Sequence, residues 1–373
     1  MNCLCNDTLN LINLLKKYNN NDKDLIKITK NKFFMNLYND MKHILKKNKI
    51  NSNSVIIDKL EEKPLNYLKD SNFTSDNIKN NIISKLKYCY KIKNDNTEII
   101  YFSSKKIIYN KLPIIIEHML VIIKLLKIVF NRNKYQKIIY FETLQKKKLP
   151  KKNNKILGPN EVNSGLTFIH SHENGEIILF RKEEILKVLI HELIHSNSID
   201  RKIIFSSQLK EFNNHFCSNY KILLNEAFTE SLATIINLFY INIYCKFNKK
   251  NLDKMFSYEI KYLNYICSKV LFYNKIEKMS DIIKDNNNCK TKFYQYTNVF
   301  SYYILKNILL TQHIQFSKIL EKYTSDYKIN NENAINEIIQ LIINNINIID
   351  NKVYDVSKDK NNSLRLCLYE LRL

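Results

Sequence analysis

Apolar residues in the N-terminal part of the chain have a helical spacing. In residues 9–15 and 81–86 they recur every three or four positions, which is typical of amphipathic helices. Asn-rich breaks at residues 19–21 and 51–53 interrupt this pattern, and the region carries no chemical motif. We therefore expect residues 1–95 to form a helical N-terminal region.

The spacing changes after residue 96, where short apolar runs begin. Residues 98–102 and 137–143 are rich in Ile, Tyr and Phe, and this composition predicts two β-strands. Residues 114–130 lie between them and predict a helix, with four polar residues close to one stripe. A membrane span needs about 20 apolar residues with few charges. We therefore expect a buried helix with one solvated edge, and no membrane span.

A hairpin and a long helical region follow. Residues 166–170 and 176–180 are β-prone runs, and the Asn-Gly pair between them is typical of a hairpin turn. Residues 183–196 predict a helix, and residues 206–347 have an almost wholly helical pattern. The chain is therefore expected to form a helix-rich α+β fold. Its expected parts are the N-terminal region 1–95, a domain at 96–347 and a C-terminal tail at 348–373.

The net charge of +23 raises the question of a nucleic acid partner. However, Lys, Asn and Ile are abundant, while the chain has only 3 Gly, 4 Pro and no Trp, which indicates an AT-rich genome. The lysines are scattered, and no basic motif interleaved with aromatic residues is present. We interpret the charge as compositional drift of solvated faces and do not expect nucleic acid as a partner. A preference for acidic substrates or for an anionic surface is the alternative.

The cysteines and the N-terminus indicate a location for the protein. The eight Cys are scattered without a CxxC pair, and the first residues lack the apolar segment and cleavage site of a signal peptide. We therefore expect free thiols in a reducing, intracellular compartment. The sequence leaves the oligomeric state open.

The strongest chemical motif is HELIH at residues 191–195. Positions i and i+4 share one face of a helix, so His191 and His195 can both direct an imidazole at one metal ion. Glu192 lies beside them, where its carboxylate can reach a metal-bound water and act as general base. The surrounding residues are apolar and predict a buried helix. Two ordinary histidines on such a helix are the alternative interpretation.

A second motif supplies candidates for a third ligand. Residues 225–230 read NEAFTE at the start of an apolar helix, so Glu226 and Glu230 lie four positions apart on one face. Two inward carboxylates on an apolar helix need a partner, and a metal ion with its histidine ligands provides one. A solvated helix start, where the dipole favours Glu, is one alternative. The other is that His215 or Asp200 is the third ligand.

HELIH followed by NEAFTE resembles the gluzincins, the thermolysin-like zinc peptidases, over about residues 165–240. The resemblance implies a zincin-like core, in which a small sheet lies over an active-site helix. It also implies that zinc is held by His191, His195 and Glu226. Glu230 would then orient a ligand histidine, His191, by accepting its hydrogen bond. The wider context also resembles uncharacterised putative metallopeptidases of large DNA viruses.

The same resemblance implies where a substrate binds. In such peptidases an edge strand beside the active-site helix pairs with an extended peptide, and Ile177, Ile178 and Leu179 are the candidates here. His170 and His172, near the hairpin tip, are interpreted as surface turn residues. The residue that stabilises the oxyanion comes from later in the chain. The sequence leaves five candidates open for it: Tyr294, Tyr296, Tyr302, Tyr303 and His313.

The expected function is hydrolysis of peptide bonds by a metal-activated water, with zinc as cofactor and a protein or peptide as substrate. One alternative is a catalytically inactive binding protein with a zincin fold. The other is a basic nucleic-acid-associated protein whose motif arose by chance. Zinc content separates this last alternative from the other two, and turnover of a peptide library separates the peptidase from the inactive protein.

Overall fold

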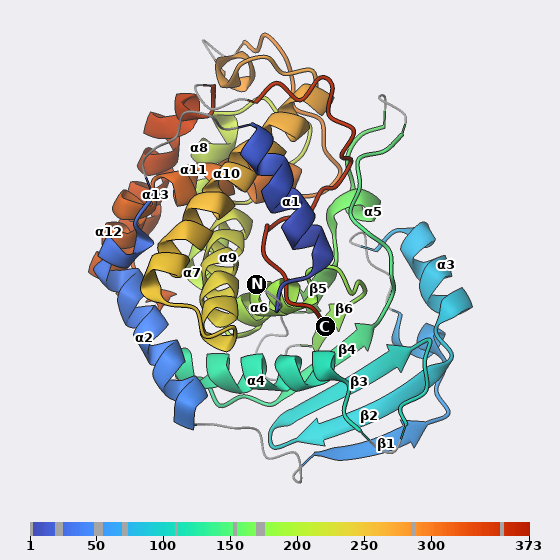
Figure 1. Cartoon of the computed structure of the whole chain (residues 1–373). Helices are drawn as coiled ribbons and strands as arrows, with labels where there is room; N and C mark the ends of the chain where they lie inside the picture. Colours follow the sequence, from blue (N-terminus) through green and yellow to red (C-terminus); the bar gives the residue numbers. More distant parts are fainter. Residues whose placement is uncertain are drawn as a thin grey trace.

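A six-stranded sheet lies along one side of the molecule, against a larger body of helices (Figure 1). The predicted fold class, α+β and rich in helices, is confirmed. The computed structural model describes residues 3–18, 25–47, 55–68, 74–108, 111–151, 155–168, 176–284, 288–350 and 354–373.

The sheet is mixed, and its strand order is β1-β2-β3-β4-β6-β5. Its strands are β1 (Ile56–Leu60), β2 (Tyr88–Asn94), β3 (Thr97–Ser103), β4 (Gln136–Phe141), β5 (Gly165–Phe168) and β6 (Glu176–Leu179). β3, β4 and β6 run parallel, and the other neighbours are antiparallel. The central strands are runs of Ile, Tyr and Phe buried on both faces, as expected for parallel strands. The two predicted strands and the predicted hairpin are confirmed, although its tip, with His170 and His172, lies outside the described residues.

The structure corrects the expected place of one strand. β6 is an interior strand between β4 and β5, and its residues Ile177, Ile178 and Leu179 are buried. The prediction that these three residues form an edge open to a peptide is therefore wrong. Within the described part of the sheet, β5 is the edge strand on this side.

The helices surround one central pair, α6 and α9, which pack against each other. α6 also packs against β5 and β6, and α9 also packs against α10 and α11. The α-helices are α1 (Asn6–Lys17), α2 (Lys32–Lys47), α3 (Asp76–Lys85), α4 (Ile114–Val129), α5 (Pro159–Val162), α6 (Ile185–Ser196), α7 (Arg201–Ile204), α8 (Leu209–Asn214), α9 (Leu224–Tyr244), α10 (Lys249–Tyr273), α11 (Lys306–Thr311), α12 (His313–Tyr323) and α13 (Glu332–Asn345). Shorter elements are η1 (Ile28–Lys30), η3 (Pro64–Tyr67), η4 (Met279–Ile282), the π-helical η5 (Phe300–Leu305), η6 (Ile346–Ile348) and the strand pair β7 (Thr324–Ser325) and β8 (Lys328–Ile329). The predicted helices at 114–130 and 183–196 are confirmed as α4 and α6.

The N-terminal region is not wholly helical, contrary to the expectation. α1, α2 and α3 are present, but β1 and β2 also belong to this region and complete the sheet. The expected boundary between residues 95 and 96 falls in the turn between β2 and β3. One core of buried residues extends from Leu4 to Leu371, so the three expected parts share a core.

The C-terminal stretch is also part of this core. Leu364, Leu366 and Leu368 are buried, and backbone N–H groups of residues 366 and 367 donate to the carboxylate of Glu184 at 3.0 and 2.7 Å. That carboxylate also pairs with the buried Lys147. The stretch therefore lies directly beside the start of α6, which it helps to fix.

The cysteine expectation needs correction. Disulfides join Cys3 to Cys245 and Cys217 to Cys289, while the other four cysteines are free. Eight scattered cysteines gave no sign of this pairing, because partners 72 and 242 residues apart meet only in the folded chain. The cysteines therefore no longer support a reducing compartment. In the described part of the chain, no helix is both long enough and apolar enough to cross a bilayer, as predicted.

Candidate metal centre

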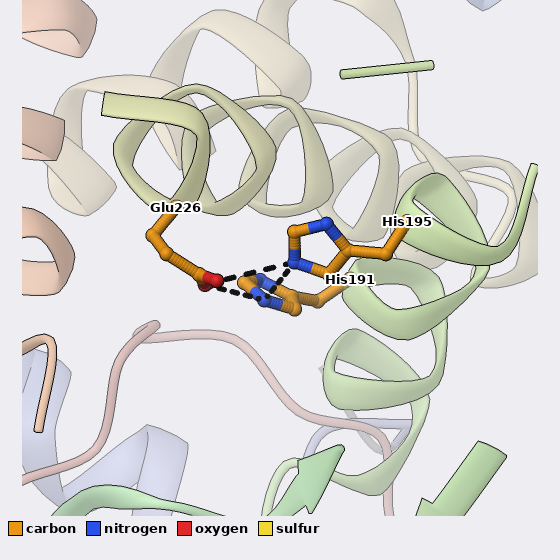
Figure 2. Close-up of side chains that lie close together, drawn as sticks. All are labelled: His191, His195 and Glu226. Atoms are coloured by element: carbon orange, nitrogen blue, oxygen red, sulfur yellow. Dashed lines mark hydrogen bonds and ion pairs between the residues drawn. The ribbon is translucent and has the colours of Figure 1, made fainter. Parts of the chain in front are cut away.

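The site is built on the contact between α6 and α9. α6 is buried on every side from residue 185 to residue 195 because its sequence is apolar around the HELIH motif. His191 and His195 face α9, which brings Glu226 from its first turn towards them (Figure 2). All three residues are within reach of one point. The helical spacing predicted this for His191 and His195, and the place of Glu226 agrees with what the resemblance implies.

The donor atoms of these residues lie at distances that suit a tetrahedral metal ion. Nε2 of His191 and Nε2 of His195 are 3.0 Å apart, and they lie 3.2 and 3.6 Å from Oε2 of Glu226. Zinc bonds of about 2.0–2.1 Å in a tetrahedron put neighbouring ligand atoms about 3.3–3.4 Å apart. The observed triangle therefore has the size that zinc needs.

The Nδ1 atom of each imidazole, on the side of the ring away from the triangle, contacts a carboxylate. Nδ1 of His191 lies 2.9 Å from Oε2 of Glu230, and Nδ1 of His195 lies 2.7 Å from Oδ2 of Asp200. A carboxylate only accepts, so Nδ1 is the donor in both bonds and, in the neutral rings, Nε2 is a bare acceptor. With both rings neutral, two Nε2 lone pairs and the Glu226 carboxylate would face one another with no hydrogen between them. Protons or a metal cation at this point would relieve the repulsion, so the residues present fit a metal ion.

Protons compete for the same atoms. Burial disfavours the charged form of His195, but its contacts with Asp200 and Glu226 outweigh burial and raise the pKa of this imidazole well above its usual value. The pKa of His191 is also raised, because hydrogen bonds to Glu226 and Glu230 outweigh burial. Metal binding must therefore displace protons from the site, and metal affinity should fall at low pH.

Asp200 contacts the imidazole of His195, although the sequence left it as a possible third ligand. After α6 the chain reverses at Ser198, whose φ of 57° is left-handed, and the N–H of Ile199 bonds the carbonyl of Ile194. This helix-ending turn brings the Asp200 carboxylate back onto His195. His215 lies elsewhere, at the end of α8, with its ring on Phe216. Neither residue therefore supplies a donor atom to the described triangle.

Glu230 contacts two lysines in addition to His191. Its carboxylate contacts the ammonium groups of Lys187 and Lys306, and all three side chains are buried. Burial alone would raise the pKa of Glu230, but the two lysines and His191 lower it well below its usual value. Lys187 was detectable in the sequence, since it stands one helical turn before His191. Lys306 comes from α11 and had no local signal.

Glu192 is fixed by the edge strand. The hydroxyl of Thr167 on β5 donates to Oε2 of Glu192 at 2.7 Å. Gly165 on the same strand provides clearance, because a Cβ at this position would lie 2.9 Å from Oε1 of Glu192. Burial raises the pKa of Glu192 above its usual value. The sequence did not indicate that Thr167 and Gly165 face this carboxylate.

The structure separates the five candidates for oxyanion stabilisation. The Tyr302 ring lies 5.9 Å from the ring of His191, and Tyr302 lines the hollow at the site. Tyr303 donates its hydroxyl to the carbonyl of Leu364, and His313 packs on Phe256. Tyr294 and Tyr296 are exposed side chains. Of the five, Tyr302 is therefore the residue placed to act at this site.

The site is nearly closed. His191 and His195 are each only 6% exposed. The hollow beside His191, Glu192 and Tyr302 has a volume of about 20 Å³, which is close to the space of one water molecule. A peptide would need this hollow to widen.

Comparison with known proteins gives one distant match. The chain is 26% identical over 210 residues to an uncharacterised protein of Acanthamoeba polyphaga mimivirus. The aligned region covers 53% of this chain and 51% of that protein. The chain therefore spans about half the length of this relative. No family model and no solved structure matches the chain.

Proposed function

We propose that this chain is a zinc-dependent peptidase, with His191, His195 and Glu226 as the metal ligands. The observation that carries the proposal is the triangle of three converging donor atoms, with a carboxylate behind each imidazole. Neutral imidazoles backed by carboxylates are the usual construction of protein zinc sites. Three protein ligands leave a fourth position open, which is typical of catalytic rather than structural zinc.

The chain's own residues support the chemistry of hydrolysis. When bound, zinc would polarise the scissile carbonyl and lower the pKa of water. Glu192, next to His191 and held by Thr167, would accept a proton from the attacking water and pass it to the leaving amine. Tyr302 is placed to donate a hydrogen bond to the developing oxyanion.

The arrangement of elements supports a zincin-like core. A sheet packs against the helix that carries HELIH, and the following long helix supplies Glu226 and Glu230. This agrees with the gluzincin resemblance of HELIH and NEAFTE. Since β5 is the edge strand and its Thr167 contacts Glu192, we propose β5 in place of β6 as the strand that an extended peptide joins.

A second candidate is a zinc-holding protein without peptidase activity. The observation that favours it is the closed site, with a hollow of about 20 Å³ at Glu192. A protein that used the metal only to fix α6 against α9 would need no larger space. This candidate keeps the same ligands and differs in turnover alone.

Metal analysis of the purified chain tests the ligands. We expect about one zinc per chain in the wild type, and loss of zinc in His195→Ala and Glu226→Ala. His215→Ala and Glu211→Ala are matched controls, because Glu211 lies on α8 and His215 caps its C-terminal end, both outside the triangle, and they should keep the metal. Unchanged zinc in His195→Ala would refute the assignment.

Turnover of a peptide library then separates the two candidates. Wild-type hydrolysis that is lost in Glu192→Gln, with zinc retained, supports the peptidase. Zinc binding with no hydrolysis in the wild type would refute the peptidase and leave the zinc-holding protein.

A further inference from the structure

A second, much larger pocket lies away from the metal centre. It is formed by the end of α2, the first two turns of α4, and the end of α9 with the turn that follows it, and its volume is about 890 Å³. α2 packs against both α4 and α9, and α4 runs across the bottom of the view in Figure 1. The volume is near the upper end of the range for small-molecule sites. Along α9, Glu226 and Tyr240 are 14 residues apart, or about 21 Å at the helical rise, so this pocket is separate from the metal centre.

The floor of the pocket is aromatic, and the hydroxyls of Tyr38 and Tyr240 are hydrogen-bonded within the protein. Nδ1 of His118 and the hydroxyl of Tyr240 lie 2.6 Å apart, and the hydroxyl of Tyr38 donates to Asn242 at 3.0 Å. The ring of Tyr244 packs against the ring of His118 at 4.6 Å. Burial lowers the pKa of His118 to about 4, so the floor is uncharged at neutral pH. A ligand would therefore meet mainly ring faces and aliphatic side chains here.

The rim of the pocket is basic. Lys42 and Lys46 extend from α2 and Lys246 from the turn after α9, and all three side chains are exposed. Glu117 is the acidic side chain among the lining residues, so the rim carries a net charge of about +2. Within the described ranges, none of these three lysines takes part in an ion pair. Nζ of Lys42 lies 5.9 Å from the centroid of the Tyr38 ring, a cation–π contact. An anionic group at the mouth would find ammonium groups that are not already paired with a carboxylate.

The basic side of the rim is held in place. Cys245, between Tyr244 and Lys246, is joined to Cys3 by a disulfide. Lys246 itself has a left-handed φ of 56°, which ends α9 and turns the chain along the mouth of the pocket. A pocket whose wall is already ordered loses less entropy when a ligand binds.

We propose that this pocket binds a single-chain anionic amphiphile, a medium-chain fatty acid carboxylate. Its alkyl chain would lie on the aromatic floor and its carboxylate between the lysines of the rim. A neutral or cationic amphiphile would gain the same apolar contacts but not the contacts with the ammonium groups. A flat membrane surface would engage the exposed lysines without filling the pocket.

Calorimetric titration of the full-length chain with octanoate, decanoate and laurate, below their micelle concentrations, tests the proposal. Affinity should rise roughly three- to fourfold with each added methylene, as expected for burial of alkyl surface. Laurate should bind more tightly than dodecanol and dodecylamine. Val121→Trp, which places a large ring into the pocket from α4, should abolish binding, while Val121→Ile should preserve it.

The role of the rim is tested with charge variants. Lys42→Ala with Lys246→Ala should weaken laurate binding roughly 4- to 20-fold, as expected for two partly solvated ion pairs, and leave dodecanol binding unchanged. Glu117→Gln should strengthen laurate binding. Lys210→Ala with Lys221→Ala, two exposed lysines elsewhere, is the matched control and should have no effect.

Three results would overturn the proposal. One is the absence of laurate binding by a wild-type chain that is folded by circular dichroism. A second is equal affinity for laurate, dodecanol and dodecylamine, since the basic rim would then select nothing. The third is binding to anionic phosphatidylglycerol vesicles that persists in Val121→Trp while free laurate does not bind, which would identify a membrane-surface patch instead.

Discussion

The hydrogen bond between Asp200 and His195 allows the metal centre to be tested with little disturbance of the fold. Asp200 Oδ2 lies 2.7 Å from Nδ1 of His195 and also accepts a bond from Asn225 at 3.3 Å. Asp200→Asn keeps the shape of the side chain and an oxygen acceptor but removes the charge. The imidazole of His195 then becomes a weaker ligand and is oriented less firmly.

The size of the effect follows from the contacts. Loss of a carboxylate behind a ligand histidine typically lowers metal affinity about 10- to 100-fold, or about 1.4–2.7 kcal/mol. The equivalent change at Glu230 is less clean, because this carboxylate also contacts the buried Lys187 and Lys306. Removing one partner from a buried ion pair costs about 3–5 kcal/mol of stability. Glu230→Gln leaves two buried lysines without their carboxylate, whereas Asp200→Asn alters the contact with His195, so we expect Glu230→Gln to destabilise the fold more than Asp200→Asn does.

The assay is competition for zinc against a chromophoric chelator at fixed pH, together with urea unfolding of the metal-free protein. Asp76→Asn is the matched control, since Asp76 is an exposed residue in the first turn of α3. The control should behave as the wild type in both measurements. Wild-type zinc affinity in Asp200→Asn would refute the view that this carboxylate supports the ligand. An equal loss of affinity in Asp76→Asn would refute the assignment to this contact.

Three further predictions concern residues around the site and the core. Glu192→Gln should retain zinc and lose hydrolysis by about 10²- to 10⁴-fold, because the amide cannot accept a proton; release of the metal would contradict its role. Gly165→Ala should keep zinc but lower both activity and stability, the latter by about 1–3 kcal/mol, because its Cβ would press on Glu192 and Val188; wild-type turnover and urea midpoint would contradict this. Burial raises the pKa of Glu259 from 4.5 to about 7, so its contribution to stability is present below about pH 4.5 and is lost as the pH rises through 7. Glu259→Gln should therefore reduce the loss of stability between pH 4 and pH 8, although the Gln side chain keeps only one oxygen to accept from the N–H of Leu368. Urea unfolding at both pH values would show whether the difference in stability between them is smaller in the variant, and an unchanged difference would contradict this.

The sequence was informative where one helix or strand determines the outcome. The four-residue spacing of His191 and His195, and of Glu226 and Glu230, brought these side chains together because each pair shares a helix face. Apolar runs likewise predicted the central strands and α4 correctly. In such cases the pattern of one segment contains the relevant geometry.

Prediction failed where distant segments had to meet. The sequence predicted β6 as the edge strand, but in the folded sheet β6 pairs with β4 and β5 is at the edge. Which strand of the hairpin pairs with β4 depends on contacts between distant segments. Lys306 reaches Glu230 across 76 residues, and the disulfides join cysteines with no local relation. No periodicity within one segment encodes such contacts.

The threading of residues 364–371 through the core has a consequence for how the protein acquires its site. Glu184 at the start of α6 is hydrogen-bonded to backbone groups that follow it by 182 and 183 residues, and Leu4 pairs with Leu371. During synthesis, the HELIH helix leaves the ribosome long before the segment that satisfies the buried carboxylate at its start. Contacts so distant in sequence form slowly. We therefore expect α6 to be incompletely ordered in a nascent chain until residues 364–371 have been synthesised, so that the candidate metal centre becomes ordered only after this stretch is available.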